Sequence, residues 1–144
     1  VADRFGDGAF PAPARLLEAS DEALRAAGLS RHKAASLRDL ARHAQDGRLP
    51  SRAESKKLSD AELIARLTDI RGIGRWTVEM FLMFNLGRPD VLPADDLGVR
   101  KGFQIAYRKR ELPKPKALSD FGRRWAPHRT LAAFYLWRAA DTTA

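Results

Sequence analysis

The sequence contains no cysteine among its 144 residues. This absence excludes disulfide bonds, zinc sites built from thiolates and iron-sulfur clusters held by cysteine for this chain. Histidine is scarce as well, because only His32, His43 and His128 occur, and they are too scattered in the sequence to indicate a metal cluster. A histidine-based zinc enzyme is therefore not expected.

Long apolar runs are also missing. No segment approaches the roughly 20 consecutive apolar residues that span a bilayer. The first residues, from Val1 to Phe5, lack the basic and apolar regions of a signal peptide. We therefore expect a cytoplasmic protein, associated with the nucleoid if it is bacterial, that has no membrane partner.

Acidic residues are outnumbered by basic ones. The 26 Lys and Arg against 18 Asp and Glu give a formal net charge of +8. Such a surface indicates an anionic partner, most often a nucleic acid, with an anionic membrane surface as the alternative. The length and a hydrophobic content of 44% suit one compact domain over residues 1–144, which we expect to be a monomer.

Strand signals are absent, whereas helix caps and apolar periods near 3.6 residues recur. The fold class is therefore predicted to be all-α. Ser20 and Ser30 are candidate N-caps, and Ser59 with Glu62 forms a capping-box pattern. The segment 48–57 is polar and unpatterned, so it is interpreted as a surface loop, and a second loop is expected at 87–95. Helices are expected at about 13–19, 20–28, 30–44, from 59 to about 70, 76–84, 97–108, 119–125 and 127–140, with 76–84 as the central buried helix.

A tight turn with two glycines stands between two of these helices. Gly72 and Gly74 flank Ile73, and a turn this tight needs backbone angles that glycine adopts cheaply. It also leaves amide hydrogens uncovered at the start of the next helix, where an anion such as a DNA phosphate binds well. Arg71 and Arg75 add positive charge. The alternative is an ordinary helix-helix turn with Ile73 in the core, but the basic context favours a helix-hairpin-helix DNA site at about 60–86.

Two carboxylates, Asp95 and Asp96, stand at the mouth of the helix that begins near Leu97. The simplest interpretation of either one is an N-cap. The helix after the hairpin should be ~18 Å long, and a nine-residue loop reaches up to ~30 Å, which is enough to return alongside it. Asp96 can therefore lie near the hairpin.

The pattern Ile-Arg-Gly-Ile-Gly-Arg-Trp-Thr at 70–77, followed by Pro-Ala-Asp-Asp at 93–96, resembles the helix-hairpin-helix DNA glycosylases of the 3-methyladenine DNA glycosylase II type. The segments 28–34, 125–129 and 135–137 are also similar to that family, so the similarity spans nearly the whole chain. The resemblance implies hydrolysis of the N-glycosidic bond of alkylated purines, such as 3-methyladenine, in duplex DNA during base excision repair. It also implies that Asp96 is catalytic.

The chemistry of that reaction agrees with a carboxylate at this position. Cleavage of the bond builds positive charge on the deoxyribose, which an ionised Asp96 stabilises while it orients or deprotonates the attacking water. The start of a helix keeps such a carboxylate ionised. An alkylated purine is already cationic and leaves without protonation, so one carboxylate suffices. Asp95 is then expected to be a cap or a structural partner.

Trp76 indicates the subclass. In bifunctional relatives a lysine at this position forms a Schiff base with the sugar, which an indole cannot do, so no associated lyase activity is expected. The missing cysteines argue against the relatives that hold an iron-sulfur cluster, and no cofactor is required. The resemblance further implies a structural monovalent cation at the hairpin, bound by the main-chain carbonyls of Thr68, Ile70 and Ile73.

The flipped base and the DNA backbone need further residues. Trp76, Met80 and Trp125 are candidates for the base pocket, with a plain core role as the alternative. Phe81, Leu82, Phe134 and Trp137 are assigned to the core. The basic clusters 56–57, 108–110 and 114–116 are either DNA contacts or solvated surface. The residues predicted to contact DNA are Arg71, Gly72, Ile73, Gly74, Arg75, Thr77, Arg100 and Lys101.

Members of the resembling family begin with additional helices before the segment that starts here at Val1. We therefore expect this chain to be a fragment or a shortened form. Three hypotheses follow: a monofunctional glycosylase for alkylated purines, a non-catalytic helix-hairpin-helix DNA-binding module, and a basic helical protein-interaction module. The first accounts for the most sequence features.

Overall fold

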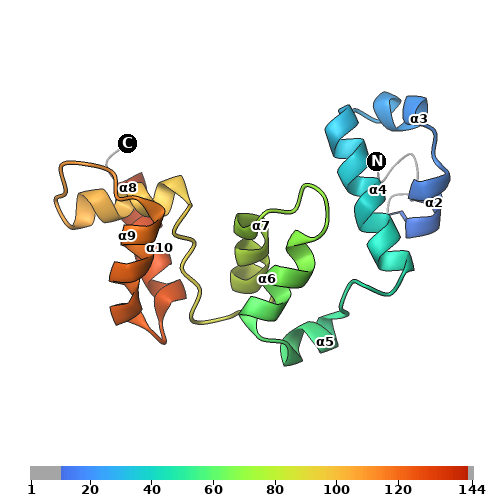
Figure 1. The fold of residues 1–144 in the computed structure, drawn as a ribbon. Coiled ribbons are helices and arrows are strands. Elements are labelled where there is room, and N and C mark those ends of the chain that lie inside the picture. Colours follow the sequence, from blue (N-terminus) through green and yellow to red (C-terminus); the bar gives the residue numbers. More distant parts are fainter. Residues whose placement is uncertain (1–10, 143–144) are drawn as a thin grey trace. The chain divides into compact units, whose positions relative to one another are not determined.

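The computed structural model describes residues 11–142, which form helices, turns and loops without any strand (Figure 1). This confirms the predicted all-α class. The chain divides into two compact units, residues 1–75 and 76–144, and each unit is described by itself. The single domain expected over 1–144 stays a prediction. No helix in the described part of the chain is long and apolar enough to cross a membrane.

The first unit is a series of helices, several of which begin at serine caps. Its elements are α2 (Pro13–Glu18), α3 (Asp21–Ala26), α4 (Arg31–Gln45), α5 (Arg52–Lys57) and α6 (Asp60–Thr68). Ser20, Ser30 and Ser59 accept backbone hydrogen bonds at the starts of α3, α4 and α6, as predicted. The core of this unit consists of Leu16, Leu24, Ala34, Ala41, Leu63 and Ile70.

Helix α5 corrects the prediction that residues 48–57 form a loop. Ser51 accepts the Glu54 N–H at 3.2 Å, and Glu54 accepts the Ser51 N–H at 2.8 Å, so the helix begins at a complete capping box. The same signature was used to predict the start of α6 at Ser59. In α5 the signature is harder to find, because Ala53 is the only apolar residue among the six that follow Ser51.

The second unit begins with the segment predicted as one helix at 76–84. Helix α7 (Arg75–Met80) continues into a π-helical turn, η1 (Phe81–Asn85). It is followed by α8 (Leu97–Ala106), α9 (Pro115–Gly122), the short 3-10 helix η2 (Arg123–Trp125) and α10 (Arg129–Asp141). The buried apolar residues include Val78, Leu82, Val99, Phe103, Leu118, Ala133 and Leu136.

Helices α8 and α10 pack unusually closely at Gly102. A Cβ atom at this position would lie 1.7 Å from the main-chain carbonyl oxygen of Leu136, so only glycine lets the two backbones approach this far. One turn earlier, a Cβ atom at Gly98 would lie 2.8 Å from Cδ1 of Trp137. The spacing of the two glycines therefore brings the side chain of Trp137 against the start of α8.

The segment at 76–84 is less buried than predicted. Trp76 is 48% exposed and Phe84 is 62% exposed. Phe84 packs instead in a surface group of aromatic rings with Phe134 and Trp137, at centroid separations of 5.8 and 6.1 Å. Phe134 itself is 40% exposed. The prediction of a central buried helix at 76–84 is therefore wrong in part, because two of its aromatic residues are exposed. The core position predicted for Phe134 is also wrong.

The predicted loop at 87–95 is held by the first turn of α10. Arg129 binds the carboxylate of Asp90 with two side-chain hydrogen bonds of 2.7 and 2.8 Å. Thr130 donates its hydroxyl to the Arg88 carbonyl at 2.7 Å and accepts the Val91 N–H at 2.9 Å. These contacts fix the segment that leads into α8.

Candidate active site

Asp96 is the N-cap of α8. Its Oδ1 atom accepts the Val99 N–H at 2.8 Å, three residues into the helix. The simple interpretation as a cap is thus correct for Asp96 itself. Of the two roles expected for Asp95, the cap is wrong, and the structural partner stays a prediction. Asp95 is exposed, whereas Asp96 is partly buried.

Two indole groups converge on the same carboxylate. Nε1 of Trp76, on α7, donates to Oδ2 of Asp96 at 2.8 Å. Nε1 of Trp137, on α10, donates to Oδ1 at 2.7 Å. Both carboxylate oxygens therefore have charge-assisted hydrogen bonds from neutral donors, and three helices of the second unit meet at this carboxyl group.

These donors control the ionisation of Asp96. Burial alone raises the pKa of this carboxyl group, but the hydrogen bonds from the Val99 N–H, the indoles of Trp137 and Trp76, and the Gly98 N–H outweigh burial. The pKa of Asp96 is consequently held below its ordinary value of 3.8. A carboxylate that is held ionised results, which is a suitable arrangement for stabilising a developing positive charge.

Trp137 is the site residue that sequence reasoning missed, because it was assigned to the core. Gly98 is the matching omission: a Cβ atom there would lie 3.1 Å from both Asp96 Oδ1 and Trp137 Nε1, so the absence of a side chain leaves room for their hydrogen bond. The pair Gly98 and Gly102, one helical turn apart on α8, was the available signal for a close helix contact.

The other two predicted pocket residues lie on α7 and at the end of η2. Met80 ends α7 and is half-buried. Trp125 packs with Phe103, Tyr107 and Phe121 in a second aromatic cluster, 5.4 Å from the Phe121 centroid. It also lines an open apolar pocket of about 400 Å³. The roles of Met80 and Trp125 in base binding stay predictions.

The hairpin lies at the end of the first unit, after α6. Gly72 has a φ of +81°, which favours glycine, and a Cβ atom there would lie 2.2 Å from the Ser36 hydroxyl oxygen. Gly74 differs: its φ lies outside the left-handed region, and a Cβ atom would meet nothing within 4 Å. The expectation that Gly74 needs a glycine-only backbone conformation is therefore wrong.

Ile73 is half-buried between the two glycines. It lines an open apolar pocket of about 440 Å³ together with Leu37 and Leu40 of α4. Its N–H donates to the Ile70 carbonyl at 3.0 Å, which closes the turn, and Ile70 is buried. Thr68, the last residue of α6, donates its hydroxyl to the Ile64 carbonyl at 2.6 Å.

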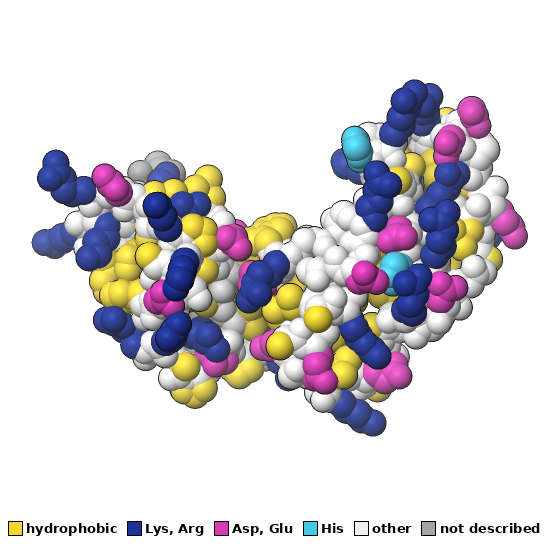
Figure 2. Space-filling view, in the orientation of Figure 1, with side chains coloured by type: hydrophobic (Ala, Val, Ile, Leu, Met, Phe, Trp, Pro, Cys, Tyr) yellow, Lys and Arg dark blue, Asp and Glu magenta, His cyan; other side chains and the backbone are white. Residues whose placement is uncertain are grey.

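The predicted DNA-binding side chains are mostly at the surface. Arg71, Arg75, Thr77 and Lys101 are exposed, and Figure 2 shows Lys and Arg side chains on the surface of both units. Arg100 is partly buried, and its Nε atom donates to the Pro113 carbonyl at 2.9 Å. Arg100 therefore stabilises the loop before α9. The expected proximity of Asp96 to the hairpin stays a prediction.

Comparison with known proteins identifies relatives along most of the chain. DNA-3-methyladenine glycosylase 1 of Schizosaccharomyces pombe is 43% identical over 134 residues, which cover 93% of this chain and 59% of that protein. A solved structure of the S. pombe 3-methyladenine DNA glycosylase in complex with abasic DNA matches with a TM-score of 0.85 and 42% identity, over 96% of this chain and 69% of that one.

A DNA-3-methyladenine glycosidase from Bacillus halodurans matches with a TM-score of 0.84 and 43% identity, over 95% of this chain and 63% of that one. The chain thus spans about three fifths of the length of the curated S. pombe relative. The family model for HhH-GPD superfamily base excision DNA repair proteins matches residues 1–128. The chain therefore belongs to the HhH-GPD superfamily of base excision DNA repair proteins.

Proposed function

We propose that the protein is a monofunctional DNA glycosylase that hydrolyses the N-glycosidic bond of alkylated purines, such as 3-methyladenine, in duplex DNA. The carboxylate of Asp96, held ionised by two indoles and a helix start, is the observation that carries this proposal. Family membership and relatives named as 3-methyladenine glycosylases give the reaction and its substrate class.

In the proposed reaction the bond between C1′ and the base nitrogen breaks, and its electron pair leaves with the cationic purine, which becomes neutral. Positive charge then develops on the sugar, close to the Asp96 carboxylate. Water forms the new bond to C1′ and releases its proton. Because the pKa of Asp96 is lowered, its carboxylate is a weak base, so stabilising the charge and orienting water are its main tasks.

The proposal excludes a lyase step through Trp76. The resembling bifunctional enzymes need a primary amine at this position to form a Schiff base, and the indole nitrogen of Trp76 instead donates its hydrogen to Asp96 at 2.8 Å. Trp76 is 48% exposed, so its ring also offers a surface on which an extruded base can stack. Strand cleavage is therefore not expected.

Binding to the DNA backbone is assigned to the hairpin. The open space around the Cβ position of Gly74 leaves room for a phosphate to approach the main chain, and the exposed Arg71 and Arg75 add attraction. The net charge of +8 favours the same partner. The solved structure of the S. pombe relative is a complex with abasic DNA, which is the product class of the proposed reaction.

The monovalent cation implied by the family resemblance fits the residues present. Its donors would be the main-chain carbonyls of Thr68, Ile70 and Ile73, and neutral carbonyl oxygens suit an ion such as K⁺. The turn closed between Ile73 and Ile70 brings these residues into one short segment. A cation bound there would add positive charge to the hairpin. A cysteine-held iron-sulfur cluster is excluded for this chain, which has no cysteine.

Excision assays on the full-length protein test the proposal. Duplexes that contain 3-methyladenine or 7-methylguanine should release the free base and keep intact strands until alkali is added. Asp96→Asn should bind the duplex without excising the base, because asparagine keeps the helix cap and loses the charge. The exposed neighbour provides the matched control, and Asp95→Asn should excise at the wild-type rate.

Excision by Asp96→Asn at the wild-type rate would refute the catalytic assignment. Salt-sensitive duplex binding without release of any base from a lesion panel would support the non-catalytic DNA-binding module instead. Negligible DNA affinity at moderate salt would support the protein-interaction module. Trapping of a covalent enzyme-DNA product with borohydride would contradict the absence of a lyase step.

A further inference from the structure

Helix α4 contacts the hairpin through residues that the proposed reaction does not use. Ser36, Asp39 and His43 are spaced by three and four residues, so they lie on one face of α4. They meet Gly72, Arg71 and Asp69, respectively, as the hairpin runs in the opposite order. Each partner lies in or directly before the turn. One face of α4 therefore contacts the hairpin and the residue before it at three successive points.

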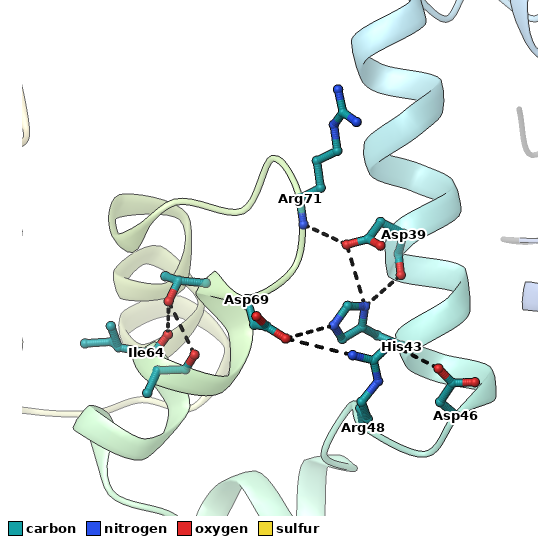
Figure 3. Close-up of polar contacts among 9 residues, drawn as sticks. Asp39, His43, Asp46, Arg48, Ile64, Asp69 and Arg71 are labelled. Atoms are coloured by element: carbon teal, nitrogen blue, oxygen red, sulfur yellow. Dashed lines mark hydrogen bonds and ion pairs between the residues drawn. The ribbon is translucent and has the colours of Figure 1, made fainter.

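The central contact is made by a carboxylate. Oδ2 of Asp39 accepts the main-chain N–H of Arg71 at 2.8 Å, across 32 residues of sequence (Figure 3). This hydrogen bond is the main reason that the pKa of Asp39 lies below its ordinary value of 3.8, with further lowering by the charges of His43, Arg42 and Arg48. The carboxylate is thus ionised at neutral pH and bound to the hairpin backbone.

His43, one turn after Asp39 on α4, stabilises the contact between Asp39 and Arg71. Its Nδ1 atom donates to the main-chain carbonyl of Asp39 at 2.9 Å, and its Nε2 atom lies 3.4 Å from Oδ2 of Asp69 (Figure 3). The ring is buried, with 5% of the residue exposed. Arg48 lies 3.9 Å from the same Asp69 oxygen. The residue that follows α6 is therefore tied to the same helix face as Arg71.

On electrostatic grounds a carboxylate beside a DNA-binding turn is unfavourable, because it repels phosphates. We propose that Asp39 is a positioning residue, which fixes the hairpin in its DNA-binding conformation through the Arg71 amide, with His43 as its support. This inference rests on the proposed function, since it assigns DNA binding to the hairpin. It adds a residue that acts through the hairpin and does not itself touch DNA.

The direction in which Kd for DNA changes distinguishes a positioning role of Asp39 from a purely electrostatic one. Loss of a negative charge near DNA strengthens binding by electrostatics alone. Loss of the positioning hydrogen bond weakens it, because the hairpin must then be ordered when DNA binds. For Asp39→Ala the two explanations therefore predict opposite changes in Kd. Asp39→Glu keeps the charge and displaces the oxygen atoms by one methylene group, so it tests the geometry alone.

The experiment measures two quantities on the full-length protein. Fluorescence anisotropy gives the Kd for a duplex with a stable abasic-site analogue, and single-turnover assays at saturating DNA give the excision rate. We expect Kd to rise about fivefold to tenfold in Asp39→Ala and about threefold or more in Asp39→Glu, with unchanged excision rates. Asp39→Asn keeps an oxygen that can accept the Arg71 N–H and removes the negative charge. Its Kd should therefore equal the wild-type value or be lower.

Glu18→Ala is the matched control, because it removes an exposed acidic charge from the same unit and should leave both quantities near wild type. Circular dichroism establishes that each variant is folded, and Asp39→Glu carries the test if Asp39→Ala does not fold. Wild-type Kd in Asp39→Glu, or tighter binding by a folded Asp39→Ala, would overturn the inference alone. A wild-type protein that does not bind the duplex would overturn the proposed function and this inference together.

Discussion

At the scale of single residues, the carboxyl group of Asp96 has more partners than a helix cap needs. The Val99 N–H suffices for capping, whereas the indoles of Trp76 and Trp137 come from other helices. Each indole donates a hydrogen bond without adding charge. These neutral donors therefore favour the ionised form of the carboxylate without neutralising its charge.

Replacement of Trp137 by phenylalanine should raise the pKa of Asp96. The aromatic ring is kept, but one of the hydrogen bonds that favour the ionised form is lost. The ¹³C chemical shift of the Asp96 carboxyl group, followed as a function of pH, measures this change. Phe134→Leu is the control, because Phe134 contacts the Trp137 ring at 5.9 Å and should leave the titration of Asp96 unchanged. An unchanged pKa in Trp137→Phe would contradict this account.

At the scale of the elements, the approach of α8 to α10 brings Trp137 to the carboxylate. The contact depends on Gly102, whose missing side chain allows the Leu136 carbonyl to lie against the α8 backbone. Most helix pairs pack through side chains at interaxial distances of 8–10 Å. In this pair a glycine replaces one layer of side chains, so the geometry of the candidate site is coupled to helix packing.

Gly102→Ala should therefore destabilise the second unit strongly. The added methyl group would lie 1.7 Å from a main-chain oxygen, which cannot move independently of α10. We expect a loss of about 3 kcal/mol or more in the free energy of unfolding, measured by chemical denaturation. A loss below about 1 kcal/mol would show that the two helices separate more easily than this contact implies.

Gly74→Ala, in contrast, should leave stability almost unchanged and weaken DNA binding. No atom lies within 4 Å of the new methyl group, and the backbone conformation is open to other residues, so stability should change by less than about 0.5 kcal/mol. Duplex binding should weaken, because the methyl group occupies the space proposed for a phosphate. Thermal denaturation and anisotropy measure the two effects. Wild-type affinity in this variant would argue against a phosphate at Gly74.

Local sequence signals predicted the helices well. Serine caps fixed the starts of α3, α4 and α6, because a cap bonds within three residues of itself. The same signal marked α5, where it was outweighed by the weak apolar pattern. Glycine was harder to interpret: Gly72 does have the positive φ that the turn predicted, whereas Gly74 does not. The sequence alone does not show whether a glycine is needed for a positive φ or for the space that a side chain would occupy.

Contacts between distant residues explain what the sequence did not predict at the candidate site. Trp137 lies 41 residues from Asp96, and Asp39 lies 32 residues from Arg71. A tryptophan in an apolar helix is most simply interpreted as core, and an aspartate in a basic helix as surface. Their partners are set by how helices cross, which neither periodicity nor capping determines. Family resemblance supplied Asp96 and included the segment 135–137, but it assigned no site role to Trp137.

At the scale of the whole molecule, carboxylates with lowered pKa values make stability depend on pH. Hydrogen bonds are the leading cause of lowered pKa values at Asp39, Glu54, Glu62, Asp90 and Asp120, and they outweigh burial at Asp96. These groups lie in both units. Each contributes stability that is fully present above its ordinary pKa, because the folded state favours the ionised form.

The melting temperature should therefore fall as pH drops below about 4, since the ordinary values are 3.8 for aspartate and 4.5 for glutamate. The sign follows from proton uptake: the unfolded chain binds protons at a higher pH than the folded chain. Scanning calorimetry between pH 7 and pH 3 measures the change. Asp90→Asn should flatten the acid decline, because the paired Arg129 then loses its ionised partner at every pH. A melting temperature that is constant over this range would contradict the lowered pKa values.

The position of Asp96 at the first turn of α8 has a consequence for the life of the protein in a cell. Its carboxyl group acquires its full set of donors only after α8 has formed and packed against α7 and α10. A nascent or partly unfolded chain therefore holds no assembled reactive centre, even if its hairpin already attracts DNA. On the proposed chemistry, base excision therefore requires a folded second unit, whereas attraction to DNA by the basic hairpin does not.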